Sequence, residues 1–162
     1  MIKPLVLYPD KSLRQPCVET FKPDELWNLK QDLWDTLQHH GGYGLAAPQI
    51  GIRKRAFICR GIFCVCPKII RSGSSTSVEE EGCLSVPGKY VIVERPDWVK
   101  VSYLTLSGTM IESKLVGFDA RVFQHELDHL DGILIIDREN QMKKTFSTDN
   151  IINAACEYMY FN

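Results

Sequence analysis

The sequence predicts an α+β domain, with antiparallel or mixed β-sheets around a central helix and a second helix near the N-terminus. Two helical segments separated by a run of short strands carry this prediction, because helices and strands do not alternate as in a doubly wound fold. The chain has 162 residues, of which 44% are hydrophobic and 24% charged. This length fits a single domain spanning residues 1–162.

Composition excludes several functional classes. The formal net charge of -1 gives no long-range field to attract nucleic acid or an anionic membrane. No hydrophobic run approaches the roughly 20 residues that cross a bilayer, and the first residues contain no apolar signal core. Six cysteines in a chain of this length do not suggest the disulfide scaffold of a small secreted domain. We therefore expect a reduced, cytoplasmic monomer that binds neither nucleic acid nor membrane.

The first helix is expected to begin near Pro23, because proline is tolerated in the first helical turn. It should end at Gly41-Gly42, since glycine is the usual residue after a helix. Apolar residues recur between these limits at helical spacing: Leu26, Leu29, Leu33, Trp34 and Leu37.

A series of short strands should follow. The apolar runs 56–59 and 62–65 flank Arg60-Gly61 and predict a tight hairpin. Residues 71–77 are rich in serine and predict a surface loop. Further strands are expected over residues 90–94, 98–106 and 110–116.

The second helix is expected to start with Asp119 as its N-cap and to stop at Gly132. Residues 133–136 are apolar, short and mostly β-branched, which predicts a buried strand.

This second helix carries His125 and His129, with Glu126 beside the first histidine. Residues four apart lie on one helix face, so both imidazoles can bind one transition-metal ion. Glu126 then lies where a proton-transfer group is needed. An amphipathic helix with two half-buried histidines would show the same short pattern, so a third ligand is needed to decide.

Cys83 is the natural third ligand. A third histidine in the extended metallopeptidase pattern would fall at Ile135, which cannot ligate. A downstream acid could only be Glu139, which is too near, or Glu157, in a weakly patterned tail. Cys83 lies in an upstream segment dense in functional side chains, although a small buried hydrophobe is the alternative interpretation. A glycine-rich segment at residues 41–49 ends in Gln49, which alone could be a surface amide.

These three segments, in this order, resemble the motifs of peptide deformylases. Residues 42–49 match the glycine-rich motif, 81–85 the cysteine motif and 124–132 the histidine motif. The compact hairpin and Pro87-Gly88-Lys89 resemble the short, phage-encoded members of that family. The resemblance implies removal of the N-formyl group from formyl-methionine of nascent polypeptides, with release of formate.

The resemblance also assigns roles to residues. It implies Cys83, His125 and His129 as metal ligands and Glu126 as the general acid/base. The Gln49 side-chain amide and the Leu84 backbone N–H would stabilise negative charge on the formyl oxygen. Substrate contacts would come from Gly44, Tyr43 and Val122, with Phe118 a further candidate for the methionine pocket. Plain core packing is the alternative for Val122 and Phe118.

The family normally works with Fe(II), and zinc, nickel or cobalt can occupy such a site. The alternative function is a zinc metallopeptidase of the HExxH type.

The chain departs from the family pattern at several positions. Tyr90 stands where an arginine often contacts the substrate backbone, and Arg121 occupies a helix position that is more often apolar. The tail mixes Lys143 and Lys144 with acidic residues, so we do not expect it to dock on the ribosome as a basic helix.

Overall fold

The computed structural model describes residues 1–19 and 23–139. In chain order its elements are the 3₁₀ helix η1 (Lys11–Arg14), α1 (Pro23–His40), β1 (Gly44–Ala46), the 3₁₀ helix η2 (Ala47–Ile50), β2 (Ala56–Cys59), β3 (Ile62–Ser72), β4 (Thr76–Gly82), β5 (Tyr90–Pro96), β6 (Trp98–Leu104), β7 (Met110–Val116) and α2 (Gly117–Leu130).

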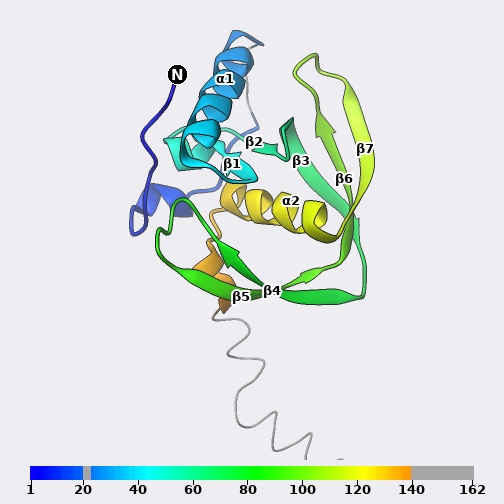
Figure 1. The fold of residues 1–162 in the computed structure, drawn as a ribbon. Coiled ribbons are helices and arrows are strands. Elements are labelled where there is room, and N and C mark those ends of the chain that lie inside the picture. Colours follow the sequence, from blue (N-terminus) through cyan, green and yellow to red (C-terminus); the bar gives the residue numbers. More distant parts are fainter. Residues whose placement is uncertain (20–22, 140–162) are drawn as a thin grey trace, which may run out of the picture.

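The strands form two antiparallel sheets. The larger has the order β1-β2-β3-β6-β7, and the smaller pairs β4 with β5. Figure 1 shows α2 in the centre, with the β4–β5 ribbon on one side and α1 beyond β1 and β2 on the other. This arrangement confirms the predicted α+β class. The pairing is antiparallel, apart from an isolated parallel bridge between Val18 and Lys54.

Two apolar clusters hold the helices in place. Leu29, Leu33 and Leu37 on α1 pack with residues of β1 and β2 such as Leu45 and Ile58. On α2, Phe123 makes an edge-to-face contact with Phe57 at 5.0 Å between ring centroids. The face of α2 that carries Phe123 and Leu130 is thereby buried on the larger sheet with Val99 and Val101.

The predicted limits of α1 are confirmed: Pro23 begins it, and Gly41 follows its end with a φ of 75°. Arg60-Gly61 forms the predicted hairpin turn, but β3 runs to Ser72, so the second strand of the hairpin is longer than expected.

Three expectations are wrong. The N-cap of α2 is Val116, and Asp119 lies in the first turn, where its carboxylate pairs with Arg60. The expected strand over residues 133–136 does not form. The chain turns at residues 131–132, and residues 135–139 are helical. Most of the expected loop at 71–77 belongs to β3 and β4, which pair with other strands.

None of the helices in the described ranges is both long and apolar enough to span a membrane.

Candidate active site

The three predicted metal ligands come from two parts of the chain, the segment that follows β4 and helix α2. Cys83 directly follows β4, whereas His125 and His129 lie one turn apart on α2. One ligand atom from each residue lies within 4.8 Å of the others, and Cys83 Sγ is 3.2 Å from His129 Nε2. A thiolate with two imidazoles is a donor set typical of divalent transition metals, and the spacing fits one ion.

Glu81 fixes the orientation of His125. Its Oε2 lies 3.0 Å from His125 Nδ1, which leaves Nε2 of the same ring facing Cys83. A carboxylate behind a ligating histidine is the common arrangement at metal sites. Burial alone would lower the pKa of His125, but hydrogen bonds with Cys83 and Glu81 raise it to about 10. Glu81 and Cys83 thus favour a positive charge at this ring, which a bound cation would supply in place of the proton.

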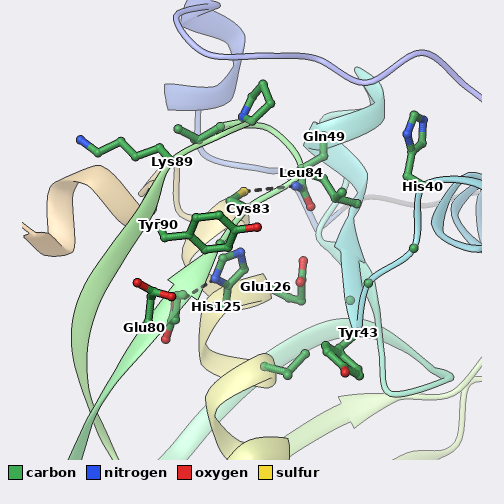
Figure 2. Close-up of a pocket in the computed structure, with 18 of the residues that line it drawn as sticks. His40, Tyr43, Gln49, Glu80, Cys83, Leu84, Lys89, Tyr90, His125 and Glu126 are labelled. Atoms are coloured by element: carbon green, nitrogen blue, oxygen red, sulfur yellow. Dashed lines mark hydrogen bonds and ion pairs between the residues drawn. The ribbon is translucent and has the colours of Figure 1, made fainter.

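Glu126 is 3% exposed, and Figure 2 shows its carboxylate beside the His125 ring. Its Oε2 and His129 Nδ1 are the buried side-chain polar atoms that lack a hydrogen-bond partner within the described part of the chain. Burial raises the pKa of Glu126 to about 7. A buried carboxyl group with this pKa can both accept and donate a proton near neutral pH.

Gly44 allows Glu126 to occupy this place. A Cβ on Gly44 would lie 2.8 Å from both Cγ and Cδ of Glu126. The carboxylate thus lies directly against the backbone of β1, an approach that only glycine permits.

Gln49 is 2% exposed and its amide is oriented at both ends. Its Oε1 accepts the Ala46 backbone N–H at 2.8 Å. Its Nε2 donates to Ser85 Oγ at 3.2 Å and lies 3.6 Å from Cys83 Sγ. The amide N–H groups therefore point toward the ligand cluster, and Gln49 is no surface amide.

A pocket of about 720 Å³ opens onto this cluster. Its wall includes residues of β1 and β4, each of which pairs with a single strand in the part of the chain that the structure describes and so has one open edge. The structure brings all the other predicted site residues to its wall: Leu84, Gly44, Tyr43, Val122 and Phe118. Val122 is also part of the core beneath α2, so packing and pocket lining both apply to it.

Sequence reasoning missed a buried ion network behind His125. Arg95 donates to Glu81 at 2.6 and 2.9 Å and to Asp128 at 2.9 Å. Arg121 also donates to Glu81, at 2.8 Å. Burial alone would raise the pKa of Glu81, but hydrogen bonds from His125 and Arg95 hold it well below its usual range. The sequence of β5 indicated a buried cation, because buried and exposed residues alternate along this strand and Arg95 occupies a buried position, as Val91 and Val93 do.

The chain is similar in sequence to the members of one known enzyme family. The family model described as Polypeptide deformylase matches residues 2–145. A peptide deformylase of Thermotoga maritima is 39% identical over 156 residues, which cover 92% of this chain and 94% of the relative. One of Rhizobium meliloti is 38% identical over 165 residues, covering 95% of this chain and 94% of that protein.

Solved structures agree in fold. The crystal structure of the Thermotoga maritima peptide deformylase superposes with a TM-score of 0.83 at 39% identity, covering 85% of this chain and 97% of that chain. The Met-Ala-Ser-bound class I type b peptide deformylase of Acinetobacter baumannii has a TM-score of 0.81 at 35% identity, covering 85% and 98%. The chain therefore belongs to the peptide deformylase family, the metal-dependent hydrolases that remove the N-formyl group from nascent peptides.

Proposed function

We propose that Cys83, His125 and His129 hold the catalytic metal and that Glu126 is the general acid/base of deformylation. The observation that carries this proposal is the buried, unpartnered Oε2 of Glu126 beside three converging metal-binding atoms. A divalent cation held there would polarise the formyl carbonyl and lower the pKa of a bound water. Glu126 would hold the proton released from that water and transfer it to the departing amine.

Gln49 and the Leu84 backbone N–H are the proposed donors to the formyl oxygen. Hydrogen-bond donors stabilise a developing oxyanion best when they are oriented beforehand. The bond from Ala46 to Gln49 Oε1 fixes which end of the amide faces the cluster. Leu84 follows Cys83 directly and lines the pocket, as Figure 2 shows.

The substrate peptide would lie between the unpaired edges of β1 and β4. An extended peptide binds such edges through backbone hydrogen bonds, with side chains entering pockets. Gly44 offers the β1 backbone, while Tyr43 and Val122 line the pocket that the first side chain would enter. Tyr43 and Phe118 meet edge to face at 4.8 Å between centroids and form an aromatic wall.

Fe(II) is the proposed ion, with zinc, nickel and cobalt as alternatives that the same donors accept. A monomer in the cytoplasm, without nucleic-acid or membrane partners, also stays a prediction, as do a single domain over residues 1–162 and a phage-encoded type. The absence of ribosome docking was predicted from the C-terminal tail. This tail lies outside the described residues.

The deciding experiment loads the metal-free protein with Fe(II) under anaerobic conditions and measures its metal content and formate release from formyl-Met-Ala-Ser. We expect formate from this peptide and no cleavage of unformylated Met-Ala-Ser. Cleavage of internal peptide bonds would instead favour the metallopeptidase of the HExxH type, which the comparisons do not favour.

Glu126→Gln is the matched variant, because it keeps the shape of the side chain and removes its acid/base function. We expect metal content equal to wild type and a turnover rate roughly 100- to 10,000-fold lower. A rate near wild type would remove Glu126 from the mechanism.

A further inference from the structure

Arg121 is a buried cation on α2 that the proposed chemistry does not use. It lies one helical turn before His125, and its side chain is 5% exposed. Its Nε lies 3.2 Å from a carboxylate oxygen of Glu79, and its Nη1 donates to Glu81 Oε1 at 2.8 Å. A guanidinium group removed from water needs such compensation at every nitrogen.

The remaining donors of Arg121 reach the backbone of the ribbon. Nη1 donates to the Val93 carbonyl of β5 at 3.0 Å. Nη2 donates to the Ser77 carbonyl of β4 at 2.8 Å and to the Ser77 hydroxyl at 2.9 Å. One side chain of α2 is therefore bonded to both strands of the small sheet.

This contact matters because the metal-binding atoms are divided between the same two elements. Cys83 continues from the end of β4, whereas His125 and His129 project from α2. The distance between the sulfur and the imidazoles depends on how the ribbon lies on the helix. Arg121 fixes that placement within two turns of both histidines.

Arg121 also determines how Glu81 meets His125. Each carboxylate oxygen of Glu81 accepts two hydrogen bonds. Oε1 accepts from Arg95 and Arg121, and Oε2 accepts from Arg95 and His125. Arg95 lies on β5 and divides its donors between Glu81 and Asp128. Arg121 is thus the cation that ties this carboxylate to the helix bearing the histidines.

We propose that Arg121 is a positioning residue of the metal site, which holds the β4–β5 ribbon on α2 and fixes the Glu81 carboxylate that orients His125. The proposal rests on the proposed ligand roles of Cys83, His125 and His129. It assigns a function to a buried cation that the proposed chemistry does not use.

The test titrates metal-free protein with Co(II) and records the dissociation constant and the visible absorption bands, which report ligand geometry. Arg121→Met removes all five N–H donors, and Arg121→Lys keeps the charge without the planar fork. We expect the dissociation constant to rise about 10- to 100-fold in both variants, as for other residues that support ligands. The bands should also shift.

Arg55→Met is the matched control. Arg55 is also largely buried, at 15% exposed, and pairs at 2.6 Å with Asp131, the C-cap residue that follows α2. Its loss should leave the dissociation constant within about threefold and the bands unchanged. A merely structural arginine would lower thermal stability in the same way and would not move the Co(II) spectrum.

The proposal is overturned if a folded Arg121→Met, or Arg121→Lys, binds Co(II) with wild-type affinity and spectrum. Should the methionine variant fail to fold, the lysine variant decides. His125→Ala separates this proposal from the ligand assignment: wild-type affinity there would refute the ligand set itself. Lost affinity in His125→Ala with normal Arg121 variants would refute the positioning role alone.

Discussion

Gly44→Ala should inactivate the enzyme without removing its metal. Gly44 lies in β1, and its φ is outside the left-handed region, so alanine causes no backbone strain. The new methyl carbon would lie 2.8 Å from Cγ and Cδ of Glu126. Carbon atoms normally approach to about 3.5–4.0 Å, so the carboxylate must retreat by about 1 Å.

The helix cannot supply that movement, because Phe123 and Leu130 anchor α2 on the larger sheet. Glu126 must therefore leave its place in the pocket. A displacement of about 1 Å at a catalytic group lowers the rate on the order of 100-fold. The three atoms nearest to the new methyl all belong to Glu126 and none to the proposed ligands Cys83, His125 and His129, so metal content should be unchanged.

The assay measures kcat and KM for formyl-Met-Ala-Ser together with metal content and thermal unfolding. Gly88→Ala is the control: Gly88 lines the same pocket, and a Cβ there meets nothing within 4 Å. Its φ of +73° costs about 1–2 kcal/mol of stability but leaves Glu126 in place. If Gly44→Ala keeps kcat within about threefold of wild type at full metal content, the steric argument is wrong.

Three further outcomes are expected. Cys83→Ser should weaken metal retention sharply, because a hydroxyl is a poorer ligand than a thiolate; unchanged metal content after dialysis would refute the ligand role. Gln49→Leu should keep fold and metal and lower kcat roughly 100-fold or more, as for one lost oxyanion donor; a near-normal rate would exclude it from the mechanism. Asp137→Asn tests stability against pH. Partial burial alone would raise the pKa of Asp137, but hydrogen bonds from Arg14 and the Leu134 N–H lower it from 3.8. Its stabilising effect is therefore present above about pH 4 and lost as the pH falls through the folded-state pKa. Urea unfolding should show a deficit of up to about 1 kcal/mol at pH 7 that shrinks in acid. A deficit that stays constant to pH 2 would contradict the sign.

The placement of His125 and His129 side by side was predictable because it depends on local order. His125 and His129 lie on one face wherever residues 117–130 are helical, and the apolar spacing of α1 and the Arg60-Gly61 turn are equally local. Cys83 required a different argument, since nothing in its neighbourhood shows that it approaches α2. Elimination of other ligands suggested it, and the family resemblance assigned it.

The wrong expectations concern segments whose structure is set by contacts with distant parts of the chain and not by local propensity. Strand β4 carries three consecutive glutamates and begins in a serine-rich segment, so its local propensity disfavours a strand. Pairing with β5 and the contacts of Glu81 override that propensity. Residues 133–136 have strand propensity but pair with none of the strands in the described ranges, and Gly132 turns the chain at a φ of 76°.

The buried ion network explains why so many charges tolerate burial beside a metal site. The buried carboxylates of Glu81 and Asp128, and the exposed one of Glu79, lie against Arg95, Arg121 and Arg138, each carboxylate within hydrogen-bond reach of at least one guanidinium. Because these charges offset one another, the network adds little net field at the ligands. The affinity of the site for a divalent ion therefore depends on its own donor atoms, Cys83 Sγ and the two imidazoles, more than on the charges behind them.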